Sequence, residues 1–156
     1  MKKKPFSIVL FAPEIPGNTG SIGRTCLALD IELILIKPYG FDLSEKSVRR
    51  AGLDYWKYVR LTEFETFEDF IRVRGPAKEN LFLFSKTGEK SYFDAPFHKD
   101  CYLIFGSETK GLPIDILDSH KKNTYKLPMF NEHVRSLNLS NVATAVGYEC
   151  LRKLNL

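Results

Sequence analysis

Short, almost entirely apolar runs of four or five residues recur along this 156-residue chain, each followed by glycine, proline or polar residues. A run without polar alternation is typical of a strand that is covered on both faces, as in a parallel sheet. Because segments with helical spacing separate the runs, the pattern predicts an α/β fold, a mostly parallel sheet with helices on both faces. The strongest strands are expected at Ser7–Phe11, Leu33–Ile36, Leu81–Phe84 and Tyr102–Phe105.

Helices are expected where capping residues precede apolar residues at helical spacing. Asn18 or Thr19 can cap a first helix, because their side chains accept hydrogen bonds from free helix amides. Ser44 can likewise cap a short helix carrying Arg49 and Arg50. The other expected elements are a weak strand at Tyr58–Leu61, a helix from Thr66 to Gly75, an irregular segment over 87–98, a helix starting at Pro113, a strand at Thr124–Leu127 and a last helix from Leu139 to Leu154.

Length and composition predict one domain over residues 1–156, with 44% hydrophobic and 27% charged residues. A formal net charge of +4 permits a nucleic-acid partner without requiring one. The three cysteines lie far apart and include no C-x-x-C pair, which argues against a zinc site or disulfides and favours a reducing cytoplasm. No apolar run is long enough for a signal peptide or a membrane span, so no membrane association is expected.

The loops after the strands are the expected ligand site, because parallel sheets bind ligands beyond the carboxyl ends of their strands. In Gly106–Pro113, G-S-E-T-K-G-L-P, two glycines let backbone amides approach a ligand closely. It is not a phosphate-binding P-loop, because Lys110 precedes Gly111, and the chain has no G-x-G-x-x-G. Glu108 has three open interpretations: a surface charge, an acceptor for a ligand, or an acceptor that positions a loop.

Two further loop stretches are candidates. Asn18–Arg24 follows the first strand, although a lone arginine on a helix is usually a solvated charge. Lys126–Asn141 follows the last strand, and on composition alone its Ser and Asn residues favour ordinary helix capping over ligand binding. The chain has no G-x-S-x-G nucleophile elbow, and His98, His120 and His133 form no metal-ligand pattern. We therefore expect neither a serine hydrolase nor a metal site.

In order along the chain, these stretches resemble the motifs of the SPOUT methyltransferase superfamily, in its SpoU branch of RNA ribose 2′-O-methyltransferases. The matching residues are Asn18–Arg24 (N-T-G-S-I-G-R), Phe105–Gly111 (F-G-S-E-T-K-G), Leu127–Met129 (L-P-M) and Arg135–Asn141 (R-S-L-N-L-S-N). Glu14–Pro16 and Arg49–Tyr55 resemble the small subfamily that methylates the wobble nucleotide, C34 or U34, of certain tRNAs.

The resemblance implies properties that periodicity could not reveal. It implies a C-terminal trefoil knot, a rare exception to the rule against threaded loops. It implies S-adenosylmethionine as the methyl donor, S-adenosylhomocysteine as the product, no metal, tRNA as the substrate and a homodimer that shares its active sites.

The resemblance also implies roles for individual residues. Arg24, contributed by the opposite subunit, is expected to act at the ribose 2′-hydroxyl, as a true base or as an electrostatic stabiliser. Glu108 and Asn138 are expected to hold the loops and the substrate in place. The expected cofactor-binding residues are Phe84, Gly106, Leu127, Met129, Ser136 and Leu137, and the expected RNA-binding residues are Asn18, Arg49, Arg50, Lys110 and Arg135.

Two alternatives stay open at this stage. The same chemistry could act on ribosomal RNA, which the small size of the chain argues against only moderately. The chain could also be a non-catalytic RNA-binding protein on the same scaffold. Neither the set of tRNAs nor the preference between C34 and U34 is determined by the sequence.

Overall fold

The computed structural model describes residues 4–44 and 54–156. Within these residues seven strands form one sheet in the order β3-β2-β1-β6-β4-β7-β5, and every neighbouring pair is parallel. This confirms the predicted α/β class. The bounds are β1 Phe6–Phe11, α1 Pro16–Ala28, β2 Glu32–Ile36, β3 Leu61–Phe64, α3 Phe67–Arg74, β4 Leu81–Phe84, β5 Lys90–Ser91, β6 Cys101–Phe105, α4 Ile114–Ser119, β7 Thr124–Lys126 and α5 Leu139–Lys153, with 3₁₀ helices at Trp56–Tyr58, Lys78–Asn80, Tyr92–Asp94 and Lys121–Asn123.

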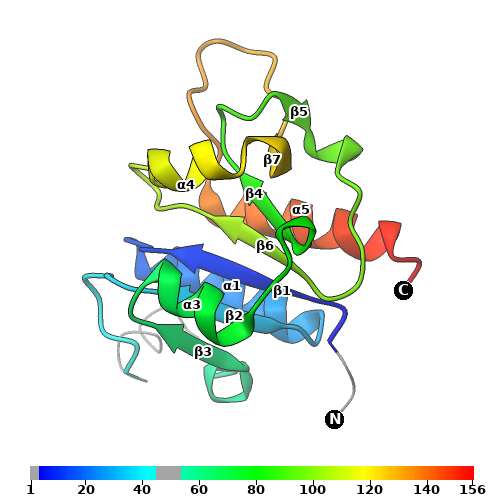
Figure 1. Ribbon diagram of the computed structural model, residues 1–156. Helices are drawn as coiled ribbons and strands as arrows, with labels where there is room; N and C mark the ends of the chain where they lie inside the picture. The colour runs from blue at the N-terminus through cyan, green and yellow to red at the C-terminus, as the bar shows by residue number, and fades with distance from the viewer. Residues whose placement is uncertain (1–3, 45–53) are drawn as a thin grey trace.

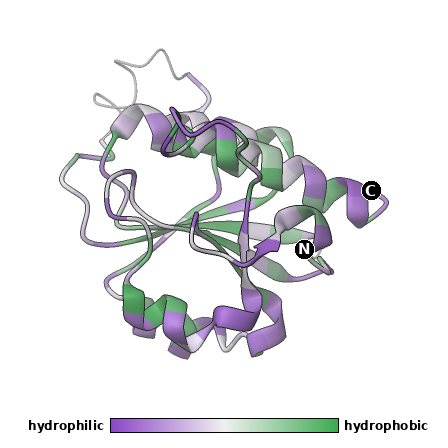
Figure 2. Ribbon diagram, turned by 90° about the horizontal axis from the view of Figure 1, so that it is seen from above, coloured by the Kyte–Doolittle hydropathy of each residue, from purple (hydrophilic) through white to green (hydrophobic). Residues whose placement is uncertain are grey.

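Alternate residues of the central strands enter two separate cores, because successive side chains of a strand point to opposite faces. Ile8 and Leu10 of β1 pack with α1 and α5, whereas Val9 packs with α3 and α4. Both helical layers turn their apolar sides toward the sheet, as seen from above in Figure 2. The wholly apolar runs are therefore explained by burial on both faces, as predicted.

The first helix begins earlier than expected, and neither Asn18 nor Thr19 is its cap. Helix α1 starts at Pro16 after Ile15, which has no capping side chain of its own. Proline is favoured at the first helical position, because its fixed φ suits the helix and it has no N–H to satisfy. Asn18 therefore lies inside the first turn, where its side chain can bond to residues elsewhere in the fold.

The prediction of a strand at Tyr58–Leu61 was wrong. Trp56–Tyr58 forms a 3₁₀ helix, and strand β3 begins only at Leu61, which pairs with Leu33 of β2. The position of β3 is set by pairing with β2 rather than by its own weak apolar pattern. The segment 87–98, expected to be irregular, contains the short edge strand β5 and a 3₁₀ helix. The expected helix after Ser44, with Arg49 and Arg50, lies outside the described residues.

The remaining elements agree with expectation to within a few residues, the usual scatter of element ends. Thr66 caps α3, its hydroxyl accepting from Asp69 N–H at 3.0 Å, and Gly75 ends the helix in the left-handed conformation. Helix α5 runs from Leu139 to Lys153 across the same face as α1. The trefoil knot stays a prediction. No helix in residues 4–44 and 54–156 is long and apolar enough to cross a membrane.

Candidate active site

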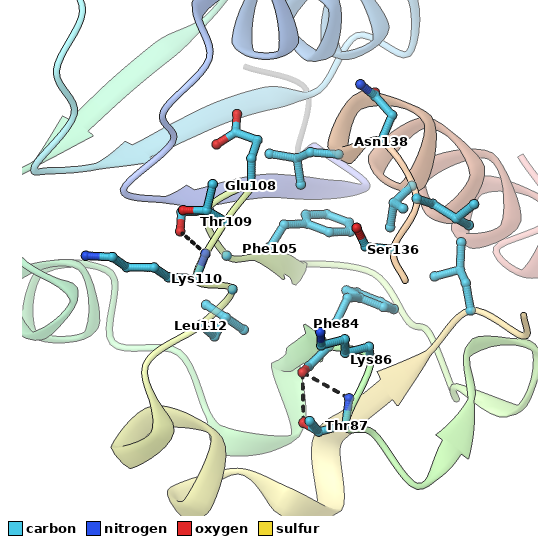
Figure 3. A pocket seen from close by; sticks show the side chains of 18 of the residues that line it. Phe84, Lys86, Thr87, Phe105, Glu108, Thr109, Lys110, Leu112, Ser136 and Asn138 are labelled. Atoms are coloured by element: carbon cyan, nitrogen blue, oxygen red, sulfur yellow. Dashed lines mark hydrogen bonds between the residues drawn. The ribbon is translucent and has the colours of Figure 1, made fainter. Parts of the chain in front are cut away.

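A cavity of about 520 Å³ lies beyond the carboxyl ends of β4, β6 and β7 (Figure 3), where a parallel sheet is expected to bind its ligand. Its volume is within the range of small-molecule sites. Three loops, each following one of these strands, contribute to its walls. All six predicted cofactor-binding residues line it: Phe84, Gly106, Leu127, Met129, Ser136 and Leu137.

The floor of the cavity is apolar and consists of two stacked aromatic rings. The rings of Phe84 and Phe105 stack with their centroids 4.9 Å apart and their planes 17° from parallel. Both side chains are almost fully buried, with exposed fractions of 6% and 1%. They end β4 and β6, which are adjacent in the sheet, so strand pairing holds the two rings together. Such a floor suits a flat, weakly polar group.

The loop after β6 is folded tightly on itself, and this fold requires glycine at its first position. Ser107 and Gly111 exchange backbone hydrogen bonds of 3.3 and 3.0 Å. A Cβ atom at Gly106 would lie 2.0 Å from the carbonyl carbon of Gly111 and 2.2 Å from the amide nitrogen of Leu112. Because both atoms belong to the backbone, any side chain at Gly106 would displace the loop.

Glu108 positions a loop, which is one of its three open interpretations. Its carboxylate accepts hydrogen bonds from the backbone N–H groups of Glu14 (2.7 Å) and Ile15 (3.1 Å). These amides precede helix α1, which has no capping side chain of its own. A carboxylate here also interacts favourably with the positive end of the helix dipole. Glu108 therefore acts as a cap supplied by the loop after β6.

Glu14 bonds in the opposite direction, so the carboxylates of Glu14 and Glu108 together join the segment before α1 to the loop after β6. We call this pair of carboxylates the clasp. Its Oε1 accepts from the Thr109 hydroxyl (2.6 Å) and from the Thr109 N–H (3.2 Å). The hydrogen bonds from Thr109 lower the pKa of the Glu14 carboxyl below its ordinary value. Sequence reasoning missed this pair, although both residues lie in the matched motifs.

Asn18 connects the clasp to helix α5. Its Nδ2 donates to Glu108 Oε1 (3.4 Å), and its Oδ1 accepts from Asn138 Nδ2 (3.1 Å). Asn138 also caps α5, its Oδ1 accepting from the N–H groups of Ser140 (2.9 Å) and Asn141 (3.3 Å). The structure thus brings Asn18, Glu108 and Asn138 together at the edge of the cavity, and all three line it.

Arg24 is the predicted site residue that lies apart from the cavity. It is exposed on α1 and does not contribute to the cavity wall. Its guanidinium carbon lies 5.4 Å from the centre of the Tyr55 ring, a cation–π contact. Among the described residues that line the cavity there is no arginine, so residues 4–44 and 54–156 of one copy place no guanidinium in the cavity wall.

The predicted RNA-binding residues are distributed unevenly. Lys110 lines the cavity and extends outward from it in Figure 3, and Arg135 is exposed on the loop before α5. Arg49 and Arg50 lie outside the described residues. A further lysine, Lys86, also lines the cavity and was not predicted. Lys86 belongs to the loop that directly follows β4. Its position after a strongly predicted strand is the sequence signal that could have identified it.

Residues 4–44 and 54–156 include no group of three or more His, Cys, Asp and Glu side chains that could hold a metal ion. The groups that the site offers are its apolar floor, its backbone amides, Lys86 and Lys110, and the network of Glu108, Asn18 and Asn138.

Comparison with known proteins agrees with this geometry. The model of the SpoU rRNA methylase family matches residues 5–148. The chain is 42% identical, over 96% of both lengths, to the tRNA (cytidine(34)-2′-O)-methyltransferase of Saccharophagus degradans. It is 42% identical, over 96% of both chains and with a TM-score of 0.87, to a solved structure described as giving insights into the 2-OH methylation of C/U34 on tRNA. The SpoU methyltransferase AviRb from Streptomyces viridochromogenes, solved with AdoMet, is 27% identical with a TM-score of 0.78, over 98% of this chain and 62% of that one.

Proposed function

Because this chain belongs to the SpoU rRNA methylase family, we propose that it methylates the ribose 2′-oxygen of the wobble nucleotide, C34 or U34, in tRNA. The observation that carries the proposal is the 42% identity of this chain to the Saccharophagus degradans enzyme, over 96% of both chains. Residues from each of the three family motifs, such as Asn18, Glu108 and Ser136, also line one cavity. The name of this relative thus gives the substrate, and the cavity is a suitable site for the reaction.

The cavity fits S-adenosylmethionine, which supplies an electrophilic methyl group when bound. The stacked Phe84 and Phe105 rings give the adenine an apolar floor, and the glycine at 106 lets backbone amides approach it. Lys86 and Lys110 are cations that can face the carboxylate of its methionine part. Ser136 supplies a hydroxyl from the loop before α5. The related AviRb structure, which contains AdoMet, supports the same cofactor here.

The protein must also hold the ribose and stabilise the negative charge that develops on its 2′-oxygen. Arg24 is the residue proposed for this task, because a guanidinium donates several hydrogen bonds to an oxyanion and a neighbouring phosphate. Arginine side chains stay protonated in proteins, which makes a stabilising role simpler than proton abstraction. Lys110 and Arg135, near the cavity, are proposed to contact tRNA phosphates, which position a nucleic acid without reading its sequence.

A homodimer follows as part of the proposal. Arg24 is exposed and does not reach the cavity of its own chain, so a second copy has to deliver it. Helix α1, which carries Arg24, is fixed to the cavity loops by the Glu14 and Glu108 clasp. The same helix would therefore be anchored at one site while presenting Arg24 to the site of the partner.

The decisive experiment is to incubate total tRNA and, separately, ribosomal RNA with the protein and radiolabelled S-adenosylmethionine, and then to map the labelled nucleotide. We expect label on the 2′-oxygen of nucleotide 34 in a subset of tRNAs. The family is named for the methylation of rRNA, so label only in ribosomal RNA would replace the proposed substrate. No transfer to either RNA, with no calorimetric binding of S-adenosylhomocysteine, would indicate a non-catalytic protein on this scaffold.

A further inference from the structure

The loop between β7 and α5 carries an unusual concentration of exposed apolar side chains. We call residues 127–138 the β7–α5 loop; it forms the long orange segment above β7 in Figure 1. Phe130 has an exposed fraction of 98%, against 77% for Ile114, the next large hydrophobic residue among those described. Met129, Val134 and Leu137 of the same loop are exposed by 38%, 47% and 45%. Single exposed apolar residues are ordinary, but a cluster at the rim of a site indicates a binding surface.

The loop is part of the site rather than a remote projection. Met129, Ser136 and Leu137 line the cavity, and Phe130 directly follows Met129. The outer end of the loop contains a turn, in which the His133 N–H donates to Asn131 Oδ1 at 2.9 Å. The Phe130 ring is therefore presented to solvent one residue away from the cavity wall, and no described side chain covers it.

The charges around Phe130 favour an anionic partner. Lys126 directly precedes the loop, Arg135 lies within it, and Lys86 and Lys110 line the cavity. Glu132 is the acidic residue within the loop itself. The carboxylates of Glu14 and Glu108 already accept hydrogen bonds from backbone and side-chain donors. Interface cores between proteins are depleted of charged residues, so this alternation of apolar and charged side chains fits RNA better than a protein partner.

We propose that Phe130 is a stacking platform for an unpaired base next to the nucleotide that is methylated. Single-stranded RNA is recognised mainly by bases that stack on aromatic side chains, with cations along the backbone. Nucleotide 34 lies in a single-stranded loop, and its ribose must enter the cavity beside Met129. A neighbouring base then reaches Phe130 with its flat face. The inference rests on the proposed function and adds a residue that selects unpaired RNA.

The test uses the full-length protein and an anticodon stem-loop RNA that carries 2-aminopurine on either side of nucleotide 34. Stacking on an aromatic ring quenches 2-aminopurine fluorescence. We expect quenching with the wild type and with Phe130→Tyr, and its loss with Phe130→Leu, which keeps a similar apolar volume without a ring. Stacking contributes enough that Phe130→Leu should weaken RNA binding by roughly 5- to 100-fold. Phe93→Leu is the matched control, because it makes the same substitution at another exposed phenylalanine that does not line the cavity, and it should bind like the wild type.

Three outcomes separate this inference from its premise. Phe130→Leu with unchanged RNA affinity and quenching, in a protein that methylates nucleotide 34, would overturn the stacking role and leave the function standing. Wild-type protein that transfers no methyl group to tRNA would overturn the premise. A change in the sedimentation of Phe130→Leu would show a contact between copies of the chain, and would also overturn the stacking role. Binding of S-adenosylhomocysteine should be the same in every variant, because Phe130 does not line the cavity.

Discussion

Asn138 shows how much one side chain contributes to the site. Its oxygen caps helix α5, while its amide nitrogen donates to Asn18, 120 residues earlier in the chain. The two ends of a single amide thus fix both the direction of a helix and the edge of the cavity. The capping role could be predicted from the sequence around Ser140. The contact with Asn18 could not, because nothing local to either residue specifies it.

Replacing Arg24 separates cofactor binding from methyl transfer. Arg24→Ala should bind S-adenosylhomocysteine like the wild type, because Arg24 does not line the cavity. Loss of a group that stabilises a developing oxyanion should lower kcat by roughly 100- to 1,000-fold. Arg24→Lys keeps the charge but not the planar fork, and should recover only part of the rate. Calorimetry and single-turnover methyl transfer to tRNA measure the two effects, and equal turnover by Arg24→Ala and wild type would contradict the role.

Gly106 and Gly17 form a matched pair for testing the cavity loop. Gly106→Ala should abolish or strongly weaken cofactor binding, because its Cβ would lie 2.0 Å from backbone. Gly17→Ala meets no atom within 4 Å and lies in helix α1, so it should bind normally and gain about 0.4–1 kcal/mol of stability. Calorimetric titration and thermal unfolding of both variants check this. Normal affinity in Gly106→Ala would mean that the loop can open without loss of the site.

Contacts at both ends of the parallel strands hold the elements of the fold together. Only those at the carboxyl ends of the strands shape the site. At the carboxyl edge, Glu108 supplies the cap that helix α1 lacks. At the opposite edge, Glu32 at the start of β2 is buried and accepts from Arg74 of α3 and Thr62 of β3. Arg74 donates from both terminal guanidinium nitrogens, Nη2 to Oε1 at 2.6 Å and Nη1 to Oε2 at 3.1 Å. This ion pair joins three elements at the edge away from the cavity.

Acid should weaken the fold through Glu32. Its burial favours the neutral acid, but the hydrogen bonds from Arg74 and Thr62 outweigh burial and lower its pKa. An unfolded glutamate has a pKa of about 4.3. Because the folded pKa is lower, the carboxylate contributes its full stability above the unfolded value and loses it as the pH falls through the folded value.

Denaturant unfolding at a series of pH values measures this contribution. Glu32→Gln should lower the free energy of unfolding near pH 7 by about 1.5–3 kcal/mol, the range for hydrogen bonds to charged groups. The difference between variant and wild type should then shrink as the pH falls. Glu89→Gln, at an exposed carboxylate, is the control and should change little. A difference that stays constant with pH would mean that Glu32 is not the titrating group.

On the scale of the whole molecule, the sheet divides the helices into two layers with different tasks. Helices α1 and α5 pack on one face, joined by a hydrogen bond of 2.8 Å between the hydroxyls of Thr25 and Thr144. Helices α3 and α4 cover the other face. The α1 layer carries the exposed Arg24 and is tied to the cavity by the clasp. The proposed dimer would use this layer to bring the guanidinium of one copy to the cavity of the other.

The proposed dimer can be tested by mixing two inactive variants. Arg24→Ala keeps its cavity, and Gly106→Ala keeps its arginine, so a mixed dimer should contain one complete site. Co-refolding equal amounts should restore roughly a quarter of wild-type activity, since half of the randomly formed dimers are mixed. Sedimentation should show a dimer in each case. An active monomer, or no recovery on mixing, would mean that Arg24 serves the site of its own chain.

The sequence by itself determined the α/β class, the strong strands and the three stretches that carry the family motifs. Apolar runs such as Leu33–Ile36 record burial on both faces, and that information is local. The sequence also predicted Gly106 as a residue of the ligand site. Its small size is required where the loop folds back on itself.

The tertiary structure alone decided which distant residues meet. Glu108 contacts Asn18 across 90 residues, and strand β6 is inserted between β1 and β4. It also set the start of β3 by pairing with β2, and it placed Arg24 outside the cavity. The physical reason is that periodicity encodes how deeply a residue is buried, whereas its partners depend on strand order and helix packing, which arise only when the whole chain closes on its core.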